Sequence, residues 1–269
     1  MEIPYRPEWR TIVVEHIRSQ VERSGASGAI VGVSGGLDSA LVLALAVEAV
    51  GNERVVAVHL PSETTPPEDE KQAEELAGQY GVEYARIPIG ESCGVVLKTG
   101  GEYGGLADAN VHSRIRMVFL YYLANANNLL VLGTGNKTEI LVGYFTKYGD
   151  GASDMLPIGD LYKTQVRQMA GEMKVPSVII DKTPTAGLPG VGADEEEIGY
   201  SYETLDKVLW GMEHGWDDAR IAQESKVGDD DVKKIASRVA RNAHKRGLGN
   251  IPKIGLKTVG IDWREDKSW

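Results

Sequence analysis

Cysteine and basic residues are both scarce in this chain of 269 residues, and each scarcity excludes a class of protein. Cys93 is the single cysteine, so the chain forms neither an internal disulfide nor a cysteine-pair metal site. Lysine and arginine number 29 against 39 aspartates and glutamates, and the net charge of −10 argues against general affinity for nucleic acid. A chain this acidic that binds nucleotides must place single cations beside the phosphates.

Long apolar runs are also missing. The most apolar stretch, residues 37–50, is too short to span a membrane and carries Asp38 and Glu48. Nothing resembles a signal peptide, so we expect a cytoplasmic protein without membrane contact. Hydrophobic residues at 42% and charged residues at 25% are ordinary for a globular protein, and the length suits one large α/β domain or two small ones.

The most informative stretch that is present runs from Ala29 to Ala40, AIVGVSGGLDSA. Its first residues predict a buried strand, its glycines and serines a tight turn, and residues 37–50 an apolar helix. Backbone N–H groups at the positive end of such a helix suit phosphate, and Asp38 beside them suits magnesium. No lysine follows the glycines, so the loop is not a Walker A motif.

Apolar strands and helices alternate along the first half of the chain. After a packing helix at residues 7–23 and the loop above, we expect strands at 54–60, 82–89 and 129–132, and helices at 68–80 and 106–127, with a glycine-rich break at 99–105. This order predicts an α/β fold with a doubly wound parallel sheet, whose ligands lie beyond the carboxyl ends of its strands.

Helices dominate the second half. After residues 157–164 we expect a helix that runs to about Met173 and has Lys163 in its first turns. Further helices are expected at residues 195–199, 202–210, 217–225 and 229–246, as a C-terminal helical extension. The last pair could be proposed as a DNA-reading helix–turn–helix, but the acidic turn at residues 228–231 would repel phosphate. No internal repeat or linker divides the chain, so we expect a single domain over residues 1–269.

A second strand end also runs into glycines and hydroxyls, in the segment GTGNKTE at residues 133–139. Thr134 lies where a nucleotide would sit, and Glu139 is placed to reach the same metal as Asp38. The alternative for Glu139 is a helix-start glutamate that serves only the helix dipole. The sequence alone leaves both interpretations of Glu139 open.

Isolated cations are the next candidates. Arg114 and Arg116 lie two positions apart on a predicted helix and point roughly 160° away from each other, so at most one can face a given ligand, and either can be a surface arginine. Lys147 lies between aromatic residues in a polar loop at residues 144–154, which offers faces for a ring and a cation for an anion. Lys163 lies in the first turns of a predicted helix, where it opposes the dipole, so a phosphate partner is favoured.

The motif SGGLDS at residues 34–39 resembles that of the PP-loop ATP pyrophosphatases, with their adenine nucleotide α-hydrolase-like fold. Further motifs make the resemblance more specific: RIRM at 114–117, GTGNKTE at 133–139, GYFTKYGDG at 143–151, PTAGL at 184–188 and His244-Lys245. With these, nearly the whole chain resembles the ammonia-dependent NAD synthetases. The resemblance implies that ATP adenylates the carboxylate of nicotinic acid adenine dinucleotide (deamido-NAD), and that ammonia displaces AMP from the NAD-adenylate to give NAD.

The resemblance also implies roles for individual residues. For ATP they are Gly32, Val33, Ser34, Gly35, Gly36, Leu37, Asp38, Ser39, Thr134, Lys163 and Thr185. For Mg²⁺ they are Asp38 and Glu139, and for deamido-NAD they are Arg114, Lys147, Asp154, His244 and Lys245. Family members are homodimers with the dinucleotide site at the interface, and we expect the same here.

The nitrogen donor and the closing loop are two further expectations. The chain lacks the glutaminase domain of glutamine-using relatives, so free ammonia is the expected donor, and we assign Asp150 to attract ammonium and accept its proton. The glycine- and proline-rich residues 181–194 are typical of a lid or binding loop. Within them, residues 188–195 lack the tryptophan and glutamine of many relatives.

Three alternatives stay open on the residues. One is another PP-loop amidoligase acting on a different nucleotide, such as the synthetase part of GMP synthetase, against which the FTKYGDG loop and His244-Lys245 argue. A tRNA-thiolating enzyme would need paired cysteines and a basic surface, and this chain has neither. A catalytically idle nucleotide sensor would have no need of both Asp38 and Glu139.

Overall fold

A computed structural model describes residues 1–185, 192–247, 249 and 251–258 of the chain. Its centre is a parallel sheet of β1 (Gly28–Gly32), β2 (Val55–His59), β3 (Glu83–Arg86) and β4 (Leu129–Leu132), in the order β3-β2-β1-β4. From β1 the chain continues to β2 and then β3 on one side of the sheet, and it crosses back to add β4 on the other side of β1. The strand order therefore reverses between β1 and β4. Ligand clefts in open parallel sheets form at such a reversal.

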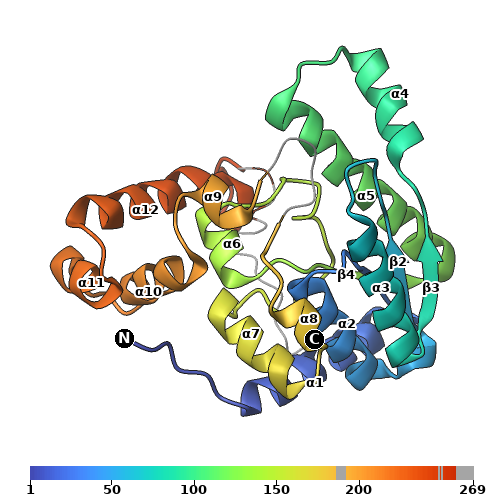
Figure 1. Cartoon of the computed structure of the whole chain (residues 1–269), viewed down its shortest axis with the longest axis horizontal. Coiled ribbons are helices and arrows are strands. Elements are labelled where there is room, and N and C mark those ends of the chain that lie inside the picture. The colour runs from blue at the N-terminus through green and yellow to red at the C-terminus, as the bar shows by residue number, and fades with distance from the viewer. Residues whose placement is uncertain (186–191, 248, 250, 259–269) are drawn as a thin grey trace.

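Helices cover both faces of the sheet (Figure 1). One face packs against α1 (Glu8–Ser24), α2 (Leu37–Val50), α3 (Pro67–Tyr80), α7 (Lys163–Glu172) and the short α8 (Ser177–Ile180). The other packs against α4 (Gly90–Gly100) and α5 (Gly105–Asn127). Successive residues of β1 alternate between the two cores, with Val31 in the first and Ile30 in the second. This confirms the doubly wound parallel sheet.

The helix α2 has the bounds that its sequence predicts and is buried on almost every side. It packs against α1 and α7 as well as the sheet, which explains why it has no polar face. The helix α4 was not expected, because three glycines lie within it, and the irregular segment is shorter than the predicted break at residues 99–105. Buried Cys93 anchors α4 in the core beneath α5, so packing outweighs the low helix propensity.

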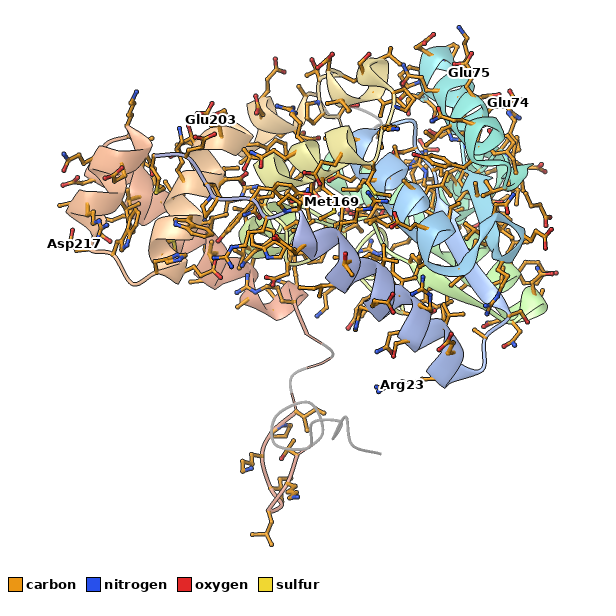
Figure 2. The ribbon with its side chains drawn as sticks, turned by 90° about the horizontal axis from the view of Figure 1, so that it is seen from below. Arg23, Glu74, Glu75, Met169, Glu203 and Asp217 are labelled. Carbon is orange, nitrogen blue, oxygen red and sulfur yellow. The ribbon has the colours of Figure 1, made fainter. Side chains whose placement is uncertain are left out.

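The remaining helices form the extension: α6 (Lys137–Val142), α9 (Asp194–Ile198), α10 (Tyr202–Glu213), α11 (Asp218–Ser225) and α12 (Asp229–Arg241), followed by a 3-10 turn at Asn242–Lys245. Another 3-10 turn, Asn52–Arg54, joins α2 to β2. It has an apolar core of its own, around Leu205 and Val232. Figure 2 shows Asp217 at one end of the molecule and Glu74 and Glu75 of α3 at the other. The last helix ends at Arg241, earlier than predicted, and residues 242–245 form the 3-10 turn.

Within the part of the chain that the structure describes, no helix is both long enough and apolar enough to cross a bilayer.

Candidate active site

A cleft of about 1070 Å³ opens at the carboxyl ends of the strands. Its walls come from the loop after β1, from α5, from residues 143–152 and from the end of α12 with the turn that follows. It brings together almost all the predicted site residues: Gly32, Val33, Ser34, Gly36, Leu37, Asp38, Ser39, Arg114, Thr134, Glu139, Lys147, Asp150, Lys163, Thr185, His244 and Lys245. Gly35 lies behind the lining, and Asp154 lies outside it.

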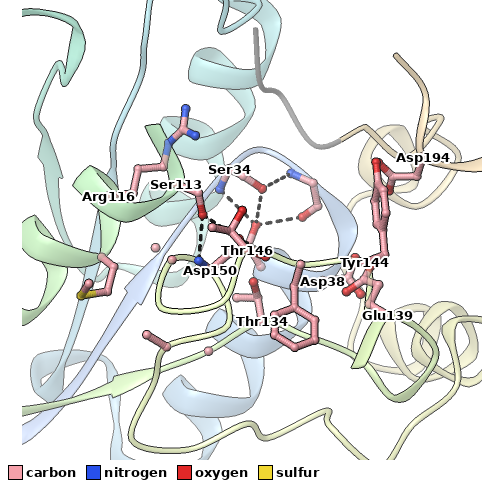
Figure 3. Close-up of a pocket in the computed structure, with 18 of the residues that line it drawn as sticks. Ser34, Asp38, Ser113, Arg116, Thr134, Glu139, Tyr144, Thr146, Asp150 and Asp194 are labelled. Carbon is pink, nitrogen blue, oxygen red and sulfur yellow. Dashed lines mark hydrogen bonds between the residues drawn. The ribbon is translucent and has the colours of Figure 1, made fainter. Parts of the chain in front are cut away.

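The loop after β1 is held in shape by its own serines (Figure 3). The hydroxyl of Ser39 accepts from the backbone N–H of Ser34 at 3.1 Å and donates to the carbonyl of Gly36 at 3.0 Å. Gly35 has a φ of +78°, and a Cβ there would overlap the backbone carbonyl of Asp69 on α3. The loop therefore needs glycine at this position, both for its conformation and for its contact with α3.

Two carboxylates from different strand ends share one ammonium group. Lys163 Nζ donates to Asp38 and lies 3.3 Å from Glu139 Oε1. Only 4% of the Lys163 side chain is exposed, and although burial disfavours its charge, the two carboxylates raise its pKa. Asn136 Nδ2 donates to the second oxygen of Asp38 at 2.9 Å, so Asp38 is fixed from both sides. Lys163, expected beside a phosphate, pairs with carboxylates in this structure.

Glu139 caps the start of α6 and also faces Asp38 across Lys163. Its Oε2 accepts from the backbone N–H of Asn136 at 3.3 Å, while the Asn136 side chain accepts from Glu139 N at 3.0 Å, which is a capping box at the start of α6. Its Oε1 faces Lys163 and accepts from Tyr202 Oη at 3.1 Å. Burial raises the pKa of Glu139 to about 7, and the carboxylate of Asp38 adds to this shift. A further cation beside Glu139 would favour its ionised form.

Asp194 adds a third carboxylate next to this pair, and sequence reasoning missed it. Its two oxygens accept from Tyr144 Oη at 3.1 Å and from Tyr202 Oη at 3.0 Å. It lies at the end of the predicted closing loop, whose residues 186–191, and so half of 188–195, lie outside the described residues. The two ends of that loop meet where Thr185 pairs with Ala193 in an antiparallel bridge.

The carboxylate of Asp150 is fixed at the cleft wall by α5 (Figure 3). Its Oδ1 accepts from Ser113 Oγ at 2.6 Å and from Thr146 N at 2.9 Å, and its backbone N–H donates to Ser113 Oγ at 2.9 Å. Both of these bonds to the Asp150 carboxylate, which come from described residues, go to Oδ1 and not to Oδ2. Asp150 is an exposed residue, so Oδ2 is available to a ligand.

Two lysines, one in residues 143–152 and one in the turn after α12, donate to backbone carbonyls rather than to carboxylates. Lys147 Nζ donates to the carbonyl of His244 at 2.9 Å, and Lys245 Nζ donates to those of Gly143 and Phe145 at 2.7 and 2.9 Å. Burial lowers the pKa of Lys245. These lysines therefore tie the loop to the turn after α12 while their charges stay free to attract an anionic ligand.

Both arginines of α5 line the cleft, on different sides of the helix. Arg114 Nε donates to the carbonyl of Lys147 at 3.4 Å, whereas Arg116 Nε donates to that of Leu60, beside the end of β2, at 3.0 Å. The cleft extends around this side of α5, so side chains on different faces of the helix reach different parts of it. Burial lowers the pKa of Arg116, to which the family resemblance assigns no role.

Asp154 lies apart from the other predicted dinucleotide residues. Its Oδ1 accepts from Tyr121 Oη on α5 at 3.1 Å, and its Oδ2 accepts from Val131 N on β4 at 2.8 Å. Within one chain it therefore braces the edge of the sheet and does not face the cleft.

Lys182 is another cleft residue that the sequence did not reveal. Its Nζ donates to Asp69 Oδ1 at 2.5 Å, to Gln72 Oε1 at 2.8 Å and to the carbonyl of Gly35 at 3.3 Å. The segment that leads into the closing loop is thereby attached to both the glycine-rich loop and α3.

The parallel sheet and the glycine-rich loop at its strand reversal define a nucleotide-binding α/β protein. A sequence profile of the NAD synthase family matches residues 9–249. The NH(3)-dependent NAD(+) synthetase of Methanococcoides burtonii is 43% identical over 258 residues, which cover 94% of this chain and 97% of that protein. The chain belongs to the NAD synthase family.

Solved structures agree with this assignment. The structure described as NMN synthetase from Francisella tularensis is similar with a TM-score of 0.82 and 33% identity, covering 93% of this chain and all of that one. The NH3-dependent NAD synthetase from Campylobacter jejuni, in complex with the nitrate ion, gives a TM-score of 0.78 at 28% identity, covering 91% and 98%. These likenesses extend over the helical extension as well as the sheet.

Proposed function

We propose that the protein makes NAD from deamido-NAD, ATP and ammonia, through an NAD-adenylate, and releases AMP and diphosphate. Family membership and the names of its relatives support this ligase activity. The observation that carries the proposal is that the side-chain ammonium of Lys163 lies between Asp38 and Glu139, beside the glycine-rich loop. Other cations, Lys147 and Lys245, line a different part of the same cleft. One cleft therefore offers distinct places for a triphosphate and for a second anionic nucleotide.

For ATP, we assign the loop from Gly32 to Ser39 together with Thr134, Lys163 and Thr185. The start of α2 supplies N–H groups and a positive helix end for the phosphates, and the lining of the cleft by these residues supports the assignment. Lys163 would neutralise charge that develops on the departing diphosphate.

Asp38 and Glu139 fit a magnesium ion by their chemistry. Both supply carboxylate oxygens, and the raised pKa of Glu139 marks a place where a cation would stabilise the ionised form. In the described part of the chain no third residue, Asp194 included, groups with these two to hold an ion, so phosphate and water oxygens would complete the shell. When bound, the ion would supply charge neutralisation on the triphosphate.

For deamido-NAD, we assign Arg114, Lys147, Asp154, His244 and Lys245. Asp154 supports a site completed across an interface, because it lies outside the cleft of its own chain and contacts α5. The helix α5 exposes apolar side chains nearby, including Val118 at 53% and Tyr122 at 70%. We therefore infer a homodimer in which α5 lies at the interface. We also propose that residues 1–269 form one synthetase unit and that the protein works in the cytoplasm, where ATP is available.

The proposed chemistry has two steps. A carboxylate oxygen of deamido-NAD attacks the α-phosphorus of ATP and diphosphate leaves, which converts a poor electrophile into a mixed anhydride. Ammonia then attacks the carbonyl carbon and AMP leaves with its oxygen, while the surplus proton passes to a base. We assign Asp150 as that base because Oδ1 is fixed by Ser113 and Thr146, which leaves Oδ2 for ammonium.

Product analysis tests the proposal and separates it from its alternatives. The chain is incubated with ATP, Mg²⁺ and either ammonium or glutamine, and with deamido-NAD, nicotinic acid mononucleotide or XMP as acceptor. The proposal expects NAD, AMP and diphosphate with deamido-NAD and ammonium. A preference for the mononucleotide would favour an activity like that named for the Francisella tularensis protein. Amination of XMP would indicate a GMP synthetase-like enzyme, and the absence of AMP with every acceptor would indicate a nucleotide sensor.

A further inference from the structure

His59 lies at the carboxyl end of β2, lines the cleft and is 2% exposed. Its Nδ1 is 2.7 Å from the backbone carbonyl of Val33, the residue that follows β1. A carbonyl oxygen only accepts hydrogen bonds, so Nδ1 carries the proton of this contact. In the neutral ring the other nitrogen, Nε2, then presents a lone pair and acts as an acceptor.

That acceptor has no partner in the described part of the chain. Nε2 of His59 is buried and makes no hydrogen bond there. Burial lowers the pKa of His59, and the charges that act on it come from Glu70 on α3, Arg86 on β3 and Arg116 on α5. The ring is therefore neutral near pH 7. An unpaired buried acceptor is unfavourable, and a donor supplied by a ligand in the cleft would remove that cost.

The region beside His59 has the shape and polarity that suit a purine. Leu60, Met117 and Leu120 line the cleft there, and Gly32 adds no side chain of its own. A Cβ on Gly32 would come within 3.2 Å of Leu120 Cδ1, so glycine lets this leucine pack closely against the end of β1. The charged groups that suit a triphosphate, Asp38 and Lys163 among them, lie toward β4 and α6. A nucleotide whose phosphates lie beside Asp38 and Lys163 would direct its base toward β2.

We propose that Nε2 of His59 accepts a hydrogen bond from the 6-amino group of the adenine of ATP and thereby selects adenine over 6-oxopurines. An amino group donates to the lone pair, whereas the 6-oxo group of a guanine or hypoxanthine would place a second acceptor against it. Sites that read a polar group through a buried partner discriminate strongly, because the wrong ligand leaves that partner unpaired. This inference rests on the proposed function only in taking ATP as the nucleotide.

The substitution His59→Asn isolates the acceptor. An asparagine amide can still donate to the carbonyl of Val33, but it has no group at the position of Nε2. His112→Asn is the matched control, because His112 is also buried and bonds a backbone carbonyl through Nδ1, that of Asp108 at 3.1 Å, but does not line the cleft. Both variants lose a buried imidazole, and only one loses the proposed contact.

The experiment measures binding of three triphosphates by calorimetry in the presence of Mg²⁺: ATP, purine riboside triphosphate, which has no 6-substituent, and ITP, which has a 6-oxo group. We expect the wild type to bind ATP about three- to tenfold more tightly than the purine riboside analogue and to bind ITP most weakly. His59→Asn should weaken ATP by that factor and leave the purine riboside analogue unchanged. His112→Asn should preserve the wild-type order and ratios.

Equal weakening of ATP and the purine riboside analogue by His59→Asn would overturn the proposal, since it would show a structural role for His59. Equal affinity of the wild type for these two ligands would also overturn it. Because binding is measured without an acceptor substrate, the result is independent of amidation. A protein that prefers ATP through His59 but forms no NAD would refute the proposed function and leave this inference intact.

Discussion

Asp38 and Glu139 meet at one ammonium group, that of Lys163, although they follow different strands of the sheet. The strand order places β1 and β4 side by side, so the loops that follow them come together at the sheet edge. A single lysine, itself almost fully buried, thus faces two acids and compensates only part of their charge. This relationship, rather than either acid alone, underlies the proposed role of the cleft in binding a metal–triphosphate complex.

The metal assignment predicts the effect of removing either carboxylate. We expect Asp38→Asn and Glu139→Gln each to weaken Mn²⁺ binding about tenfold or more in the presence of a non-hydrolysable ATP analogue, measured by electron paramagnetic resonance. Glu197→Gln is the control, because Glu197 also lines the cleft but bonds Tyr144 instead of Lys163. Unchanged Mn²⁺ affinity in Glu139→Gln would remove Glu139 from the metal site.

The glycine-rich loop predicts different outcomes for two glycine substitutions. Gly35 and Gly51 both have positive φ, +78° and +86°, so alanine costs about 1–2 kcal/mol of backbone strain at either position. Only at Gly35 does the new Cβ also overlap the backbone of Asp69, whereas Gly51 faces open space. Gly35→Ala should raise the Kd for ATP more than tenfold in calorimetry.

Gly51→Ala serves as the control for backbone strain. It should lower the free energy of unfolding in urea without changing the Kd for ATP. If both substitutions leave the Kd unchanged, the shape of the loop after β1 is not what binds the nucleotide.

The assignment of Asp150 predicts a defect in the amidation step. Asp150→Asn should keep the hydrogen bonds from Ser113 and Thr146 but lose the charge that attracts ammonium, so kcat should fall about 100-fold and saturation should need more ammonium. Steady-state rates of NAD formation over a series of ammonium concentrations measure this. The exposed Asp160, which pairs with Lys137, provides the control Asp160→Asn with a wild-type rate. An unchanged rate and ammonium dependence in Asp150→Asn would contradict the assignment.

The inferred dimer predicts that charge on α5 separates the subunits. Val118 and Tyr122 lie one turn apart on this helix, so glutamate at both positions places two charges in the proposed interface. Sedimentation velocity should show a dimer for the wild type and a monomer for the double variant. Ile12 of α1 is 63% exposed, and Ile12→Glu should leave the dimer intact. A wild-type monomer would contradict the interface.

Local sequence signals predicted most of the fold. Periodicity and turn residues gave the bounds of α2 and β4 as the structure has them, because both lie in the core and their apolar runs end at glycine or asparagine. They failed for α4, whose glycines argue against a helix and whose formation depends on packing beneath α5. That contact joins segments whose proximity is set by the tertiary fold, so no local pattern reports it.

The sequence predicted those site residues that lie in short local motifs. The loop 34–39, Glu139 and Lys163 follow strand ends or begin helices, where glycines and hydroxyls mark them. Asp194, Lys182 and His59 were missed because their partners, Tyr202, Asp69 and Val33, come from other elements. Asp154 shows the opposite case: the family resemblance assigns it to the dinucleotide, yet it braces the sheet edge outside the cleft of its own chain.

Transfer of an oxygen atom tests the central claim, which is that the cleft adenylates a carboxylate. Deamido-NAD labelled with ¹⁸O in its nicotinate carboxylate is incubated with the protein, ATP, Mg²⁺ and ammonium, and the products are analysed by mass spectrometry. The account predicts AMP carrying one ¹⁸O, diphosphate without label, and NAD that keeps one ¹⁸O in its amide. Formation of ADP with the label in orthophosphate, or of unlabelled AMP, would contradict it.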